Sequence, residues 1–201
     1  MAAVNSNTVN AERANLAVLY TEVRGFTRMS EILEPAVVIA RIAEFFAMVS
    51  AAIVRHEGIV RSMLNDNLVA TFAGPGNAAR AVEAAQEILR EFVGIGEAWQ
   101  RDYGFLTAVA MGLHCGDVVV GDSGRQSPAQ VLIIGDGLSV AERLLHRSRA
   151  GEFIFSKEIM DTLAAAGHPV GAEKLPALNI KGREAVQLYG VLLDTRLDFT
   201  D

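Results

Sequence analysis

The chain has 201 residues, of which 51% are hydrophobic, and its formal net charge at pH 7 is −6. This length and composition suit one domain with a sizeable core and leave little room for a second domain. The negative charge and the scattered lysines and arginines disfavour binding to a nucleic acid, but they leave a small anionic ligand possible.

A single cysteine, Cys115, excludes an internal disulfide, and no CxxC motif or Cys/His cluster has the spacing of a soft-metal site. These features fit a reducing compartment, so we expect a cytoplasmic location. The four histidines are far apart in the sequence, and each is expected to be a surface residue or one with satisfied hydrogen bonds.

The N-terminal part is expected to be a flexible lead-in over residues 1–14, which are small and polar and lack the pattern of a secretion signal. An apolar run at residues 16–20 predicts a buried strand that ends close to Glu22. Residues 36–54 come nearest to a membrane span, but Arg41 and Glu44 interrupt them, so we expect a helix and no membrane segment. Because this helix is apolar on more than one face, a second subunit is expected to cover it.

Two short strand patterns follow in residues 58–74, separated by Asn65, Asp66 and Asn67. Asparagine and aspartate tolerate the left-handed backbone of a tight turn, so Asp66 is predicted at the tip of a hairpin. Residues 77–93 have apolar side chains at helical spacing opposite a charged face, which predicts an amphipathic helix.

The C-terminal half is predicted to begin with two strands in residues 105–124, hinged at Gly116 and Asp117. Residues 130–148 predict a strand, a Gly135-Asp136 turn and a helix. A strand at 152–155, a short helix from Ser156, a pair of strands around 179–193 and a tail at 194–201 complete the chain. The β-α-β-β-α-β order, with additional strands and helices, is typical of an α+β fold, the ferredoxin-like α/β sandwich.

Two acidic residues, Glu22 and Asp66, are the first candidates for a functional site. If the first strand is central, its end lies beside the hairpin, and two carboxylates at neighbouring strand ends favour Mg²⁺ or Mn²⁺ with substrate phosphates completing the coordination. The alternative is that both are turn residues, with Asp66 there because it favours the hairpin.

Six segments, in this order and spacing, resemble the class III adenylate/guanylate cyclase catalytic domain over residues 15–193. They are TEVRGFT, GIVRSMLNDNLVATF, AARAVEAAQEI, MGLHCGDVVVGDSG, LIIGDGLSVAERL and NIKGREAVQLYGV. The resemblance implies a homodimer, or a heterodimer with another cyclase domain, whose nucleoside triphosphate sites lie at the interface and are built from both protomers. It also implies two metal ions that promote attack of the ribose 3′-oxygen on the α-phosphate with release of pyrophosphate.

In this resemblance the first metal aspartate falls on Glu22 and the second on Asp66, so one ligand is altered by an extra methylene and the other is kept. The backbone N–H groups of the turn after the first strand are expected to cradle the triphosphate, and Gly25 allows the close approach. Lys181 matches the lysine that pairs with the terminal phosphates; alternatively it is a solvated hairpin lysine. The residues of the turn are Val23, Arg24, Gly25, Phe26 and Thr27.

Arg143 matches the arginine that stabilises the charge that builds on the α-phosphate, a role that suits a planar group with several donors. The alternative is a surface arginine paired with Glu142 or Asp136. One turn earlier, Ser139 stands where most active members have an asparagine that contacts the ribose.

The base-selecting pair departs further from the family. Adenylate cyclases place a lysine at the position of Ser62 and an aspartate or threonine at that of Leu132, and guanylate cyclases usually have a glutamate and a small polar residue. A buried leucine cannot accept a hydrogen bond, and an unpartnered polar edge costs about 1–3 kcal/mol, so we expect selective adenine recognition to be lost.

Two functional hypotheses follow. In the first, the domain is a nucleotidyl cyclase with weak or non-standard base specificity. In the second, it is a catalytically silent cyclase-homology domain that dimerises or binds nucleotide as a regulatory module in signal transduction.

Overall fold

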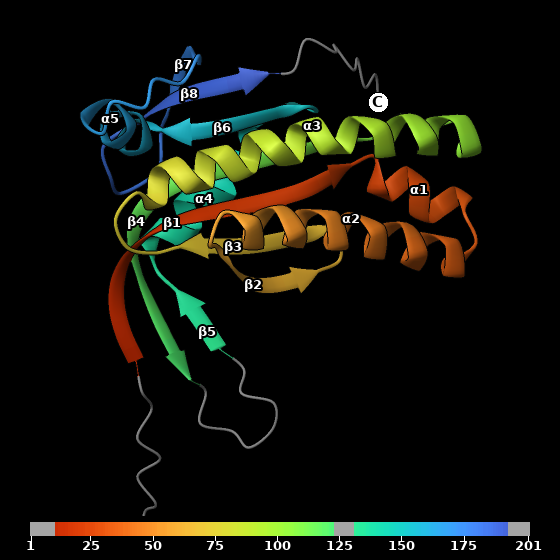
Figure 1. The fold of residues 1–201 in the computed structure, drawn as a ribbon, viewed down its shortest axis with the longest axis horizontal. Coiled ribbons are helices and arrows are strands. Elements are labelled where there is room, and N and C mark those ends of the chain that lie inside the picture. Colours follow the sequence, from red (N-terminus) through yellow and green to blue (C-terminus); the bar gives the residue numbers. More distant parts are fainter. Residues whose placement is uncertain (1–10, 123–130, 193–201) are drawn as a thin grey trace, which may run out of the picture.

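A computed structural model of the chain describes residues 11–122 and 131–192. Within these residues, one eight-stranded mixed sheet is packed against five helices (Figure 1). The order of elements confirms the predicted fold class. In chain order the elements are β1 (Ala11–Arg24), α1 (Phe26–Ile32), α2 (Pro35–Arg55), β2 (Ile59–Leu64), β3 (Asn67–Phe72), α3 (Asn77–Tyr103), β4 (Ala108–Asp122), β5 (Val131–Ile134), α4 (Asp136–Arg147), β6 (Glu152–Ser156), α5 (Lys157–Ala165), β7 (Glu173–Leu178) and β8 (Val186–Leu192).

The sheet has the strand order β2-β3-β1-β4-β6-β8-β7, and β5 pairs with the far end of β4. All pairs are antiparallel except β4 with β6. β1 and β4 lie at the centre, where they pair along their whole length from Ala11–Gly121 to Arg24–Ala108. The predicted first strand is therefore central, the condition under which its end lies beside the β2–β3 hairpin.

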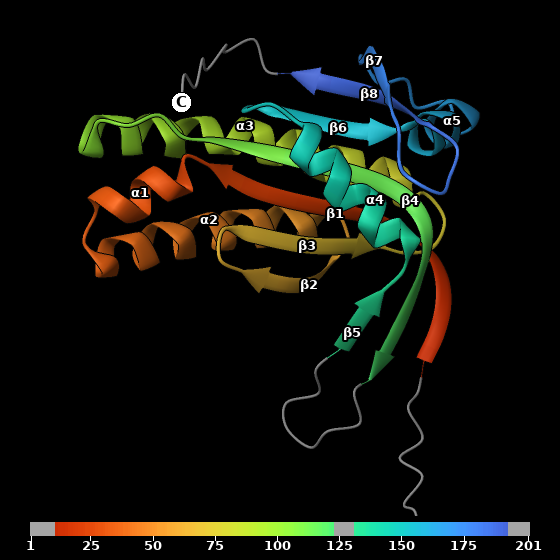
Figure 2. The ribbon, with the colours of Figure 1, turned by 180° about the vertical axis from the view of Figure 1, so that it is seen from behind.

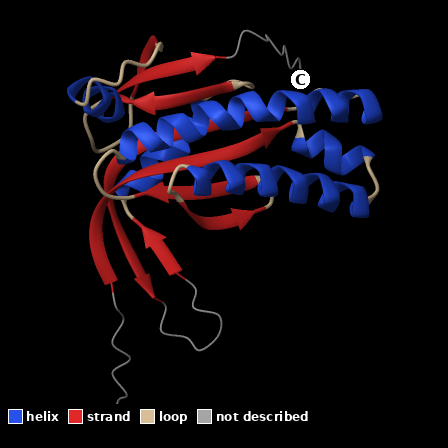
Figure 3. Cartoon of the chain, in the orientation of Figure 1, coloured by secondary structure: helices blue, strands red, loops and turns tan. Residues whose placement is uncertain are grey.

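Helices cover both faces of the sheet. α2 and α3 lie in front of it in Figure 3, and α4 lies on the opposite face, which Figure 2 shows. Successive residues of a strand point to opposite faces, and β1 follows this rule. Ala17 and Leu19 belong to the core beneath α2 and α3, whereas Leu16 and Val18 pack on the side of α4. By the same alternation, Glu22 belongs to the α4 face.

The hinge predicted at Gly116 and Asp117 is wrong, because β4 runs unbroken from Ala108 to Asp122. Gly116 has a different role in packing. A Cβ atom at this position would lie 2.8 Å from the Cα of Gly137, so the glycine allows the first turn of α4 to approach the strand. A close approach of two backbones, rather than a turn, explains this glycine.

Other boundaries also differ from the sequence-based expectations. β1 begins at Ala11, inside the segment expected to be a lead-in, since residues 11–14 pair with β4. α3 extends ten residues beyond the predicted end, to Tyr103, and β7 precedes residue 179. The expectations for residues 1–10 and 194–201, and for residue 193 as the domain boundary, lie outside the described residues.

α2 is, among the described residues, the one helix long and apolar enough to cross a membrane by length and composition. Its inner face packs in the core through Phe45, Val49 and Ile53. Its outer face exposes Ile39 and Val54. That a second subunit covers this outer face stays a prediction.

Candidate functional site

Glu22 and Asp66 lie at adjoining strand ends. Glu22 is opposite Asn67 in the β1–β3 register, and Asp66 occupies the turn between β2 and β3. The turn is tight because Asn65 adopts a left-handed backbone with φ 56°. The backbone N–H of Val23 donates to the carbonyl oxygen of Asp66 at 3.4 Å, which joins the end of β1 to the hairpin. The two predicted ligands are thus neighbours.

The charge on Glu22 is influenced by both acidic and basic neighbours. Burial raises the pKa of this carboxyl, and the nearby Asp66 carboxylate raises it further. Arg24 and His146 act in the opposite direction and lower the pKa of Glu22. The Asp66 carboxylate therefore lies close enough to disfavour the charge of Glu22.

Arg24 connects this site to α4. Its guanidinium forms an ion pair with Oε1 of Glu22. Nη2 of Arg24 also donates to the carbonyl oxygens of Leu145 at 3.0 Å and Ser148 at 3.1 Å, at the C-terminal end of α4. Sequence reasoning missed this contact, although the alternation along a strand already places residues 22 and 24 on one face.

The predicted phosphate cradle begins at Gly25, whose φ of 90° requires a residue that tolerates the left-handed region. Phe26 and Thr27 form the first turn of α1, where backbone N–H groups have no partner within the helix. Val23 differs from the prediction, because its N–H is already donated to Asp66. Of the predicted cradle, the backbone N–H groups from Gly25 onward therefore remain the candidates for binding phosphate.

Ser139 and Arg143 lie one turn apart on the exposed side of α4. Within the described part of the chain, Arg143 forms no hydrogen bond or ion pair, and Asp136, one of its alternative partners, pairs with Arg183 at 2.6 Å. α4 lies close to the sheet because β4 has a glycine beneath it. A Cβ on Gly112 would lie 2.2 Å from backbone atoms of the helix.

The remaining predicted residues lie on β2, on β5 and in the turn before β8. Lys181 is exposed in the turn between β7 and β8. Ser62 is exposed on β2 opposite Val69, which packs on the α4 side of the sheet, so Ser62 shares the face of Glu22. Leu132 pairs with Gly121 through the backbone, and its side chain lies outside the described residues.

The predicted residues therefore form two groups in one protomer. Glu22 and Asp66 lie near the C-terminal end of α4, which Arg24 contacts. Ser139 lies toward the other end of this helix, about 9 Å along the axis from Leu145 at 1.5 Å per residue, and Arg143 lies between them on the exposed side of the helix. The pair between Arg183 and Asp136 holds the β7–β8 turn, with Lys181, at that same N-terminal end.

The donor set fits a hard divalent ion in part. Carboxylate oxygens are the ligands that Mg²⁺ and Mn²⁺ prefer, and Glu22 and Asp66 supply them from adjacent elements. No cluster of three or more aspartate, glutamate, histidine or cysteine side chains with the arrangement of a metal site occurs in residues 11–122 and 131–192. Two side chains with phosphate oxygens and water completing the shell remain compatible with Mg²⁺, which usually keeps several waters.

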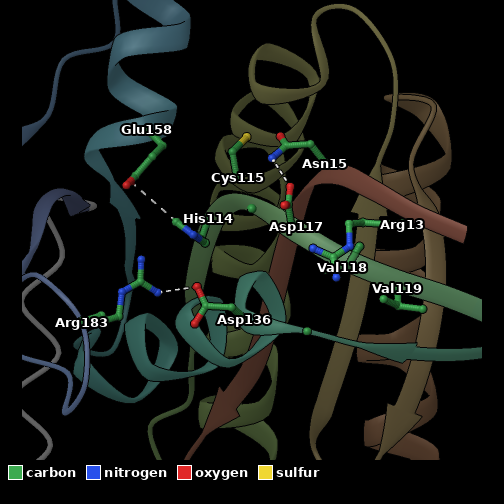
Figure 4. A pocket seen from close by; sticks show the side chains of 12 residues that line it. Arg13, Asn15, His114, Cys115, Asp117, Val118, Val119, Asp136, Glu158 and Arg183 are labelled. Carbon is green, nitrogen blue, oxygen red and sulfur yellow. Dashed lines mark hydrogen bonds and ion pairs between the residues drawn. The ribbon is translucent and has the colours of Figure 1, made fainter.

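A pocket of about 520 Å³ lies elsewhere, along the edge of β4 between the segments that pair with β6 and with β5 (Figure 4). His114 is buried in its wall, with Nδ1 2.7 Å from Oγ of Ser156 and 3.7 Å from Glu158. Burial lowers the pKa of this histidine. None of the predicted site residues lines the pocket, whose walls combine residues 114–119 of β4 with residues of β1, α4, α5 and the turn before β8.

The sequence matches the family model described as the adenylate and guanylate cyclase catalytic domain, over residues 9–192. An adenylate cyclase of Anabaena cylindrica is 30% identical over 188 residues, which are 90% of this chain and 37% of the relative. Adenylate cyclase 1 of Rhizobium meliloti is 29% identical over 142 residues, 67% of this chain and 21% of that protein. The chain thus spans well under half the length of these relatives.

Solved structures with a similar fold include the adenylyl cyclase CyaB from P. aeruginosa, with a TM-score of 0.82 and 23% identity. That match covers 95% of this chain and 100% of the solved one. The guanylyl cyclase Cya2 matches with a TM-score of 0.80 and 23% identity, over 90% of this chain and 92% of the other. At this identity the likeness concerns the fold.

Proposed function

Because the chain belongs to the adenylate and guanylate cyclase catalytic-domain family, we propose that it is a nucleotidyl cyclase domain. It converts a nucleoside triphosphate into a cyclic nucleotide and pyrophosphate with a divalent metal. Family membership confirms the resemblance carried by the six motifs. The observation that carries the proposal is the approach of Glu22 and Asp66 at adjoining strand ends.

The reaction forms a bond between the ribose 3′-oxygen and the α-phosphorus and breaks the bond to the β-phosphate oxygen, so charge builds on the α-phosphate. Glu22 and Asp66 would hold Mg²⁺ or Mn²⁺, two ions in the active form, and the bound metal would neutralise phosphate charge and favour the deprotonated 3′-oxygen. The N–H groups from Gly25 onward bind phosphate oxygens. Arg143 donates to the α-phosphate, and Lys181 pairs with the terminal phosphates.

Each site is shared by two protomers. The acids lie near the C-terminal end of α4, and Ser139 and the Lys181 turn lie near its N-terminal end. A two-fold symmetric partner brings the second group of one protomer to the first group of the other, and creates two equivalent sites. A homodimer satisfies this requirement, and so does a heterodimer with another cyclase domain.

Base specificity is proposed to be weak. Ser62 has a short side chain on an exposed edge strand, on the face that carries Glu22. A serine hydroxyl both donates and accepts, so it does not discriminate between the polar edges of adenine and guanine as a lysine or a glutamate does. A cytoplasmic location, expected from the single cysteine, is part of the same proposal.

The ion pair between Glu22 and Arg24 supports a second candidate function. An acid already paired with a guanidinium offers less to a metal, which suits a silent domain that dimerises or binds nucleotide without turnover. Under this alternative, triphosphate binds and the dimer forms, but no cyclic product appears.

The deciding experiment incubates the purified chain with Mn²⁺ and, separately, ATP, GTP, CTP and UTP, and measures cyclic product by mass spectrometry. Asp66→Ala is expected to abolish the product. Asp161→Ala, which removes a carboxylate from a surface ion pair with Lys157, is the matched control and retains it. The absence of cyclic product from all four nucleotides refutes the enzyme and leaves the silent domain.

A further inference from the structure

Arg24 is held at three points in the site. It pairs with Oε1 of Glu22 and donates to the carbonyl oxygens of Leu145 and Ser148. We propose that Arg24 is a built-in cation that competes with the divalent ion for the Glu22 carboxylate and thereby sets the metal affinity of the site. The inference rests on the proposed function for the location of the metal, but it concerns binding and not turnover.

The backbone determines this competition. Residues i and i+2 of a strand point to the same face, so Arg24 is the neighbour that β1 places beside Glu22. The two α4 carbonyl oxygens keep the guanidinium in position, because an arginine already bonded to them gives up those contacts when it turns away. The side chains of Glu22 and Arg24 are 15% and 26% exposed, so water screens the pair only in part.

A divalent ion and a guanidinium cannot both be in direct contact with Oε1 of Glu22. A carboxylate oxygen binds Mg²⁺ at about 2.0–2.1 Å, which brings the ion next to any donor on the same oxygen. Two positive groups at that separation repel each other. Metal binding by Glu22 therefore requires Arg24 to move or the carboxylate to rotate, and either change lowers the apparent affinity.

The glutamate itself contributes to the competition. An aspartate at position 22 is shorter by one methylene and draws its carboxylate back by up to about 1.5 Å. In this chain the longer side chain carries the carboxylate that pairs with Arg24. Two features of this chain therefore act on the affinity for the metal. One is the glutamate that replaces the family's aspartate at position 22, and the other is Arg24.

The test is a titration of the metal-free chain with Mn²⁺ alone, followed by the electron paramagnetic resonance signal of the free ion. Loss of a partly exposed ion pair is expected to change affinity by about fivefold. Arg24→Met and Glu22→Asp are each expected to lower the Kd for Mn²⁺ by this factor. Arg28→Met is the matched control. It removes the same charge from an exposed position in α1 and leaves the Kd near the wild-type value.

Two further variants separate competition from other causes. Arg24→Met in a Glu22→Gln background gives no gain in affinity, because no carboxylate remains to be released. Arg24→Lys keeps a positive charge beside Glu22 and stays close to the wild-type Kd. Circular dichroism reports whether Arg24→Met folds without its contacts to α4, and if it does not, Glu22→Asp carries the test.

An unchanged or higher Kd in both Arg24→Met and Glu22→Asp overturns the proposal, and so does an equal gain in Arg28→Met, since a general charge effect then explains it. Undetectable Mn²⁺ binding in every variant also overturns it. If the variants bind Mn²⁺ more tightly but no cyclic product forms, the role of Arg24 is supported and only the proposed turnover is refuted. Failure of the proposal for Arg24 and failure of the proposed function therefore give different results.

Discussion

The backbone N–H of Val23 donates to the carbonyl oxygen of Asp66 at 3.4 Å, between the residue that follows Glu22 and the tip of the β2–β3 hairpin. Backbone pairing therefore sets the separation of the two acidic residues, and their side chains do not hold the strands together. A change of either carboxylate is expected to alter metal binding while the sheet keeps its register.

The shared site predicts complementation between two inactive variants. Asp66→Ala removes an acid from one part of the site, and Arg143→Ala removes the guanidinium from the other. If the two residues of one site come from different protomers, random mixing gives half heterodimers with one intact site each. About a quarter of the wild-type activity returns, as follows from two-fold symmetry. The measurement is cyclic product after mixing and subunit exchange.

Each variant alone, incubated under the same conditions, is the control and stays inactive. If the mixture also stays inactive although native mass spectrometry detects the heterodimer, Asp66 and Arg143 act within one protomer, and the proposed assembly is wrong.

Because β4 and α4 approach closely, one additional methyl group at Gly112 is predicted to lower the free energy of unfolding strongly. Gly112→Ala places a Cβ 2.2 Å from the carbonyl oxygen of Ala141 and the backbone nitrogen of Leu145, so the helix must move. We expect a loss of about 3 kcal/mol or more in the free energy of unfolding, measured with urea.

Gly94→Ala is the matched control. Gly94 lies inside α3, and a Cβ there meets no atom within 4 Å. Alanine restricts the unfolded chain and favours the helix, so this variant is expected to be more stable by about 0.5–1 kcal/mol. Equal effects of the two substitutions contradict the packing of α4 described here.

Local patterns in the sequence were sufficient to predict most of the fold. The continuous apolar run at residues 16–20 predicted a buried strand, and the turn chemistry of Asn65 predicted the hairpin, because both depend on neighbours in the chain. Central placement of β1 then brought Glu22 beside Asp66. The strand and the hairpin were predictable since each expresses a preference of the backbone or a short-range pattern, whereas the central placement of β1 was a condition of the prediction that the structure supplied.

Long-range packing was not predictable in the same way. Gly116 resembled a hinge, but α4, about twenty residues later in the chain, is the reason for the glycine. Arg24 looked like part of a phosphate-binding turn, yet its side chain extends to carbonyl oxygens of Leu145 and Ser148. A sequence pattern lacks the position of the distant element, so neither contact could be inferred.

The thiol of Cys115 is predicted to react slowly with alkylating reagents near neutral pH. Burial, with a smaller influence of Glu158, raises the pKa of this thiol to about 12. A thiolate is the reactive form, so at pH 8 labelling with iodoacetamide is expected to be on the order of a thousandfold slower than for an ordinary cysteine. The unfolded chain in urea is the control and reacts at the ordinary rate. Fast labelling of the folded chain contradicts the raised pKa of the thiol.

High pH is predicted to destabilise the fold through Tyr20. Burial and then Glu142 raise the pKa of this phenol from 10.0 to about 12, so the folded state disfavours its charged form. The associated stability is complete below pH 10 and is lost as the pH rises toward 12. Tyr20→Phe removes the ionisable group, so its free energy of unfolding is expected to fall less steeply over this range. An unchanged slope in Tyr20→Phe contradicts the prediction.

Restoring the base-selecting pair is predicted to increase the preference for ATP over GTP. Ser62→Lys places an ammonium group on the exposed side of β2, and Leu132→Asp adds an acceptor at the position where adenylate cyclases have an aspartate or threonine. A base edge that regains its partners gains about 1–3 kcal/mol, so the preference for ATP over GTP is expected to rise by roughly 5- to 150-fold in kcat/KM. Ser62→Ala is the control, because it alters the same position without adding a donor and leaves the preference unchanged. A double variant that binds Mn²⁺ and turns over nucleotide, but keeps the wild-type ratio of ATP to GTP, places base recognition elsewhere on the protein.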